Sequence, residues 1–115
     1  MALARFIHDG DAIDYTPGGN IAAGDVVVQE DLIGVAKLDI PAGRLGALSV
    51  TGVFDFPKAT GSGSAIPAGA TVYWDESAKQ AYRPVGGSLG SDNLLGKATL
   101  AAGEADETVR VRLTQ

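Results

Sequence analysis

Apolar and polar residues alternate along several short stretches of this chain, which is the pattern of half-buried β-strands. The clearest stretch covers residues 47–57, where Leu48 and Phe56 share one parity and polar residues take most positions of the other. Gly52 lies in phase with the apolar residues and predicts a bulge or a close approach of two chains. We expect one strand here, ended by Pro57, which removes a backbone donor from the sheet.

Further strands are expected where short apolar stretches lie between turn-forming residues. Asp9-Gly10 favours a tight turn, so an N-terminal hairpin is expected over residues 4–15. Glycine makes up 16 of the 115 residues and leaves little room for a long helix. The other predicted strands cover residues 26–29, 32–38, 71–74, 80–85, 94–100 and 108–113. The length and pattern fit a single all-β domain over residues 1–115.

Two parts of the chain share a succession of short motifs, which indicates an internal duplication. Ile21-Ala-Ala-Gly-Asp-Val-Val is similar to Ile66-Pro-Ala-Gly-Ala-Thr-Val, and a Leu-x-Gly-x-Ala motif follows each. Ala42-Gly43 and Ala102-Gly103 then precede the last strand of each copy. The repeat units would cover residues 21–53 and 66–113. Chance similarity is the alternative, because Ala-Gly pairs are common in such a composition.

If the duplication holds, each Ala-Gly pair turns the chain and the next valine enters a strand. The expected architecture is two similar β units of short strands, packed as a small β-barrel or β-clip-like domain.

The charge of the chain argues against nucleic-acid binding. Nine Lys and Arg residues stand against fourteen Asp and Glu residues, and no two basic residues are adjacent. Phosphate contacts need clustered cations, so we expect no nucleic-acid partner. The absence of cysteine excludes disulfides and cysteine-based metal sites. No apolar stretch approaches the roughly 20 residues of a membrane helix, and the N-terminus lacks signal-peptide features, so we expect a protein made in a bacterial cytoplasm without membrane contact.

Two motifs come close to catalytic patterns and fail on named residues. Ser88 lies in a Gly-Gly-Ser-Leu-Gly sequence of the nucleophile-elbow form, but the only histidine, His8, lies far upstream. Residues 91–99 are similar to a phosphate-binding loop around Lys97, but Ala98 stands where Mg²⁺ binding requires a hydroxyl. The sequence around Ser88 is better interpreted as a Gly/Ser loop, and Lys97 as a solvated strand residue.

A third pattern comes close to a calcium loop. Asp9, Asp11 and Asp14 have suitable carboxylates, but Ile13 occupies a ligand position. His8 has no second His or Cys that would complete a transition-metal site. We therefore expect no catalytic residue, no metal site and no cofactor, so the chain is predicted not to be an enzyme.

The aromatic residues leave one binding function open. Trp74 follows Tyr73 in a predicted strand, so one of the two faces the core and the other does not. With Tyr82 they would form a stacking surface for a small ligand or saccharide, whereas core or interface packing is the alternative.

Several segments have a characteristic joint order, which covers nearly the whole chain. They are Gly52-Val-Phe followed by Pro57-Lys58, Ala-Gly followed by Val72-Tyr-Trp-Asp75, Leu94-Leu-Gly-Lys-Ala98, and Val109-Arg-Val-Arg-Leu113. In this order the chain resembles a phage and prophage family known as DUF2190, whose members are regarded as capsid decoration, or cement, proteins. Some members carry the label RecA/RadA recombinase, against which the broken phosphate-binding loop, the acidic charge and the short length argue.

The resemblance implies a structural protein on the exterior of the virion capsid, with the major capsid protein as its partner. Related β-clip or small-barrel decoration proteins form trimers, so a homotrimer is expected. The residues expected to bind the partner, by adding a strand to it, are Ala2, Leu3, Arg5 and Phe6. Two alternatives remain: another virion component, such as a head-fibre base or tail-associated module, and a small-ligand or saccharide-binding module.

Overall fold

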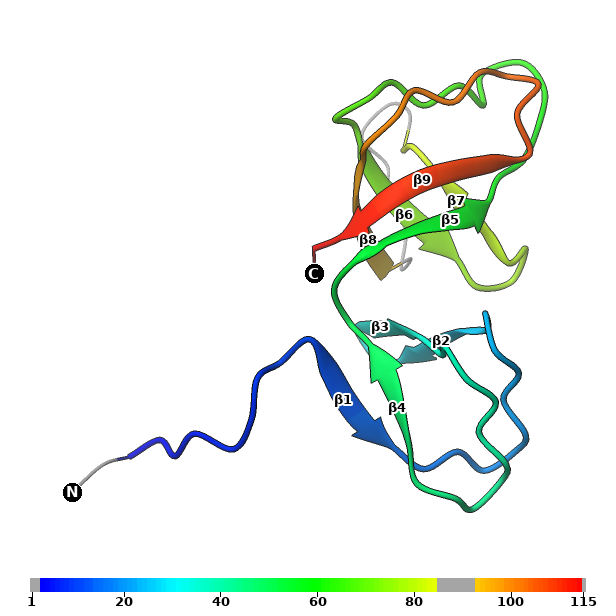
Figure 1. The fold of residues 1–115 in the computed structure, drawn as a ribbon. Coiled ribbons are helices and arrows are strands. Elements are labelled where there is room, and N and C mark those ends of the chain that lie inside the picture. Colours follow the sequence, from blue (N-terminus) through cyan, green and yellow to red (C-terminus); the bar gives the residue numbers. More distant parts are fainter. Residues whose placement is uncertain (1–2, 85–92, 115) are drawn as a thin grey trace.

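The computed structural model describes residues 3–84 and 93–114. Short strands form two antiparallel sheets in this part of the chain, so the predicted all-β fold class is confirmed (Figure 1). No helix in the described residues could cross a membrane. The strands are β1 (Ala12–Tyr15), β2 (Val26–Gln29), β3 (Leu32–Val35), β4 (Gly46–Ser49), β5 (Val53–Pro57), β6 (Thr71–Asp75), β7 (Gln80–Tyr82), β8 (Asn93–Ala98) and β9 (Thr108–Leu113).

The two sheets have the same strand topology. The N-terminal unit, β1 to β4, has the order β1-β4-β3-β2, and the C-terminal unit, β5 to β9, has the order β5-β9-β8-β6-β7. Without β7 the two orders agree, so β1 corresponds to β5, β2 to β6, β3 to β8 and β4 to β9. β7 is an additional strand that extends the C-terminal sheet beyond β6.

A glycine turn before β2 recurs before β6 with the same backbone hydrogen bond. The amide of Gly24 donates to the carbonyl of Ala36 at 2.6 Å, and the amide of Gly69 donates to the carbonyl of Ala98 at 2.7 Å. The φ angles of the two glycines are 92° and 83°, a region that strains residues with a side chain. The Ala-Gly turns expected before these strands are therefore present in both units.

A pair of exchanged backbone bonds closes each unit near this turn. Ile21 pairs with Ile40 in the N-terminal unit, and Ile66 pairs with Ala102 in the C-terminal unit. Ala102 thus corresponds to Ile40. The sequence motifs instead matched Ala102 with Ala42, which lies two residues further along the chain.

Each unit has a small apolar core built from corresponding positions. In the N-terminal unit the residues are Ile13, Tyr15, Ile21, Val27, Ala36, Ile40 and Leu48. In the C-terminal unit the corresponding residues are Phe54, Phe56, Ile66, Val72, Ala98, Ala102 and Val111. The shared topology thus places apolar side chains at the same points in both units.

The N-terminal sheet packs its second face against the C-terminal unit. The residues on this face are Val26, Val28, Ile33 and Val35. Val27, which alternates with them, faces the N-terminal core instead. At the turn between β2 and β3, the side-chain amide of Asn93 donates to the carbonyl of Glu30 at 2.7 Å. The contact between the units is therefore mainly apolar.

The single strand expected over residues 47–57 is wrong, because this stretch forms β4 and β5 in different sheets. Residues 50–52 belong to no strand, and Gly52 has a φ of 116° where the chain passes from one unit to the other. The apolar alternation continues across this junction because Leu48 faces the N-terminal core while Phe56 faces the C-terminal core.

The N-terminal hairpin expected over residues 4–15 does not form. Residues 3–11 belong to no strand, and β1 pairs with β4, where Ile13 lies opposite Leu48. Both of these side chains contribute to the N-terminal core. Pairing with β4 thus buries apolar surface of β1 that the local hairpin would have left at an edge.

Candidate functional site

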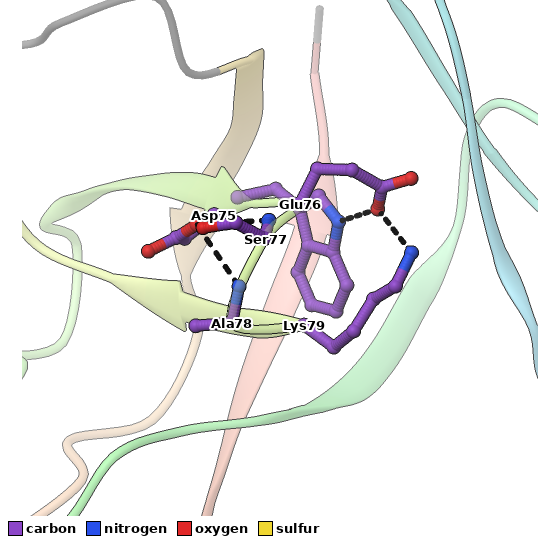
Figure 2. A network of polar contacts seen from close by, with 6 residues as sticks. Asp75, Glu76, Ser77, Ala78 and Lys79 are labelled. Atoms are coloured by element: carbon purple, nitrogen blue, oxygen red, sulfur yellow. Dashed lines mark hydrogen bonds and ion pairs between the residues drawn. The ribbon is translucent and has the colours of Figure 1, made fainter.

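The β6–β7 hairpin holds the only tryptophan in a polar network (Figure 2). Trp74 is 2% exposed, and its indole Nε1 donates to Oε1 of Glu76 at 3.0 Å. The ammonium of Lys79 lies 2.9 Å from the same oxygen. Burial raises the pKa of Glu76, but the bonds from Lys79 and Trp74 outweigh it and hold the pKa below its ordinary value. Glu76 is therefore an ionised structural acceptor.

Asp75 closes the turn of the same hairpin (Figure 2). Its Oδ1 accepts bonds from the Ser77 hydroxyl at 2.7 Å, the Ser77 amide at 3.0 Å and the Ala78 amide at 3.1 Å. The bond from the Ser77 hydroxyl is the main cause that lowers the pKa of Asp75. Asp75 and Glu76 are thus both committed to holding the hairpin, and neither is arranged as a general acid or base.

A groove of about 550 Å³ lies between this hairpin and β2. Its wall on one side is the aliphatic strand β2, and on the other it includes Trp74, Glu76 and Lys79. Ligand pockets of this size orient their ligands through a few free polar groups. Glu76 and Lys79 are paired with each other, and Asp25, which also lines the groove, accepts a bond from the amide of Ala22, so the groove lacks the character of a specific small-molecule site.

The expected stacking surface of three aromatic residues is not assembled. Trp74 faces the core, where its ring centroid lies 6.0 Å from that of Phe56 in an edge-to-face arrangement. Tyr73 and Tyr82 lie opposite each other on β6 and β7, with ring centroids 6.4 Å apart. Because side chains alternate along a strand, these two tyrosines lie on the face of the sheet opposite to Trp74.

The two catalytic near-matches centre on Ser88 and Lys97. Ser88 lies outside the described residues. The ammonium of Lys97 donates to the hydroxyl of Thr71 at 2.6 Å on an exposed sheet face.

The residues of the calcium-like pattern are exposed, as is His8. Within residues 3–84 and 93–114, no group of three or more His, Asp or Glu side chains could hold a metal ion.

Lys58 is a buried cation that the sequence interpretation missed. It is 4% exposed, and its ammonium donates to the carbonyls of Ala59 at 2.8 Å and Asp106 at 3.0 Å and to the hydroxyl of Ser64 at 3.3 Å. It thereby joins the glycine-rich loop after β5 to the loop before β9. A lysine between a strand-ending proline and a Gly/Ser loop was the available signal.

The N-terminal arm, residues 3–9, extends away from both sheets (Figure 1). Its large apolar side chains are exposed: Leu3 by 100%, Phe6 by 79% and Ile7 by 67%. Of the other two residues expected to bind a partner, Arg5 is exposed on the same arm and Ala2 lies outside the described residues. The arm thus exposes three large apolar side chains together.

The comparison with known families covers both units and the end of the arm. A family model described as phage cement protein matches residues 7–113. No curated protein and no solved structure gives a significant match. The capsid decoration role implied by the sequence resemblance is confirmed, with the phage capsid as location and partner. The chain belongs to the phage cement protein family.

Proposed function

We propose that this protein stabilises the head shell from outside by joining neighbouring subunits of the major capsid protein, without catalysis and without a cofactor. The observation that carries the proposal is the cement-protein match over residues 7–113, which includes every strand of both units. The two sheets offer broad surfaces, and Glu76 and Lys79 of the groove beside Trp74 are paired with each other.

The N-terminal arm is the proposed contact with the capsid protein. An extended segment with free backbone groups can add a strand to an exposed sheet edge of its partner. Burial of a side chain such as Leu3 or Phe6 contributes about 1.5–3 kcal/mol before the cost of ordering the arm is subtracted. Arg5 lies between them, where it would contact a polar rim of the bound edge.

The proposed assembly is a homotrimer made in the host cytoplasm before it binds the shell. Leu38 and Leu45 are exposed by 78% and 71% and line a groove of about 600 Å³ in the N-terminal unit. Exposed apolar side chains beside a groove favour association, and a neighbouring copy would cover them. Sedimentation of the purified protein tests this point, because a monomer at micromolar concentration contradicts it.

Binding to purified expanded shells of the phage that encodes the protein tests the proposed function. We expect saturable co-sedimentation and a higher disruption temperature of the decorated shell. Phe6→Glu should weaken binding without changing the unfolding temperature, because Phe6 lies outside both cores. Leu100→Glu, which alters a side chain that is 56% exposed on the C-terminal unit, is the control. Binding to tails but not to shells would overturn the proposal.

A further inference from the structure

The exposed face of the C-terminal sheet carries a row of side chains that crosses four strands. In the row, Thr71 lies opposite Lys97, Lys97 opposite Arg112, and Arg112 opposite Val53. The pair Arg110 and Asp55 lies beside the row on β9 and β5. We call these residues the cationic face: Val53, Asp55, Thr71, Lys97, Arg110 and Arg112.

Two cations of this face lack a compensating charge. Arg110 is balanced, because its Nε and Nη2 donate to the two carboxylate oxygens of Asp55 at 2.9 and 3.2 Å. Lys97 donates to a neutral hydroxyl, and no carboxylate of the described residues forms an ion pair with Lys97 or Arg112. Like charges directly opposite each other on neighbouring strands are destabilising. The isolated protein therefore retains an unfavourable pair at this position.

The cationic face contrasts with the rest of the molecule. It holds three of the nine basic residues and one of the fourteen acidic residues, so the remainder holds six basic and thirteen acidic residues. The face thus has a charge of +2 and the remainder a charge of −7. Such an asymmetry orients a protein as it approaches an acidic surface, because one face is attracted and the others are repelled.

The corresponding face of the N-terminal unit is already in contact with protein. By register, Val26 corresponds to Thr71 and Val35 to Lys97. Val26 and Val35 pack against the core of the C-terminal unit. One sheet face therefore supports a permanent apolar contact in the N-terminal unit, and its counterpart is open and charged in the C-terminal unit.

We propose that the cationic face docks on an acidic surface patch of the capsid protein, an inference that rests on the proposed function. Carboxylates of the partner would neutralise the repulsion between Lys97 and Arg112. The neighbouring Tyr73 and Tyr82 add the aromatic contact that is enriched at protein interfaces. Two copies of the chain each carry a net charge of −5 and repel each other overall, and a net charge of +2 on the face is small for binding phosphates, so a capsid subunit is favoured over both.

The test compares two variants with the same change of net charge in binding to expanded shells. Arg112→Glu reverses one charge and lowers the net charge of the face from +2 to zero, whereas Arg44→Glu makes the same change at an exposed arginine of the N-terminal unit. We expect Arg112→Glu to weaken binding by at least about tenfold, Arg44→Glu to change it less than about twofold, and Arg112→Lys to retain it. The affinity of the wild type should also fall more steeply with salt than that of Arg112→Glu.

Equal binding of Arg112→Glu and wild type would overturn this inference and leave the proposed function intact. No binding of the wild type would overturn both. A changed sedimentation coefficient of Arg112→Glu without shells would assign the face to contacts between copies. Binding of the wild type to a DNA oligonucleotide, lost in Arg112→Glu, would assign it to nucleic acid. Either result would overturn the inference.

Discussion

Gly96 lies so close to the main chain of Arg112 that a Cβ at Gly96 would stand 1.9 Å from the Arg112 carbonyl oxygen. Gly96 pairs with Val72, and at the corresponding position of the N-terminal unit Gly34 pairs with Val27. A Cβ at Gly34 would also collide, at 2.7 Å from the Cβ of Leu48. The central strand of each unit thus requires a residue without a side chain at this position.

Gly96→Ala should lower the free energy of unfolding by at least about 2 kcal/mol, because the main chains of β8 and β9 would have to separate. Urea unfolding measures this change. Gly103→Ala is the control: its nearest atom is Oδ2 of Asp106 at 3.7 Å, and we expect a change within about 0.5 kcal/mol. A Gly96→Ala protein as stable as the Gly103→Ala protein would contradict the close approach.

Lys58→Met should destabilise the protein by about 1–3 kcal/mol, because three oxygen acceptors lose a charged donor. The loop after β5 should also become more sensitive to limited proteolysis, since Lys58 joins it to the loop before β9. Lys37→Met replaces an exposed lysine and should change neither property. Unchanged stability and proteolysis in Lys58→Met would show that the loops hold together without the ammonium group.

The fluorescence of Trp74 should report the titration of Glu76. The pKa of Glu76 is lowered from 4.5, so the ionised form that accepts the indole bond is lost as pH falls through a range centred below 4.5. We expect constant emission above this range and a change below it. Glu76→Gln should flatten the curve, and identical curves for the two proteins would refute the assignment.

The ion pair of Asp55 and Arg110 should make a pH-dependent contribution to stability. The hydrogen bond from Arg110 lowers the pKa of Asp55 below 3.8, so the contribution is present above that value and disappears as pH falls through the lowered pKa. Both side chains are about half exposed, so solvent screens the pair and the contribution is small. Asp55→Asn should be less stable than the wild type at pH 6, and the difference should close below pH 3.8. A difference that is independent of pH would contradict this account.

Local patterns in the sequence predicted the fold class and most strands, because alternation and turn residues act over a few positions. Which strands pair with each other was not predictable in this way. β1 is flanked by a tight-turn signal, yet it pairs with β4, since Ile13 and Leu48 meet in one core. The alternation over residues 47–57 also concealed the junction at Gly52, because Leu48 and Phe56 keep the same parity while they face different cores.

The candidate surfaces were predictable to different degrees. The alternation of valine and arginine over residues 108–113 is enough to place Arg110 and Arg112 outward. The exposure of Phe6 was less predictable, because the hairpin expected over residues 4–15 does not form. The pairing of Arg112 with Lys97 depends on the register between β8 and β9, which no local pattern determines. Duplication of one ancestral unit remains our proposal for the shared topology.

The arm enters β1, and the chain passes from β4 to the C-terminal unit, at the same end of the β1–β4 pair. Ala12 lies opposite Ser49 there, and just beyond them the amide of Val50 donates to the carbonyl of Asp11 at 3.0 Å. If a shell held both the arm and the C-terminal unit, tension between them would pull the two strands apart from this end. Tension applied in this way breaks the hydrogen bonds one after another, at lower force than a pull along the strands. The N-terminal unit would then lengthen first, as an extensible link that keeps the protein attached while the shell strains.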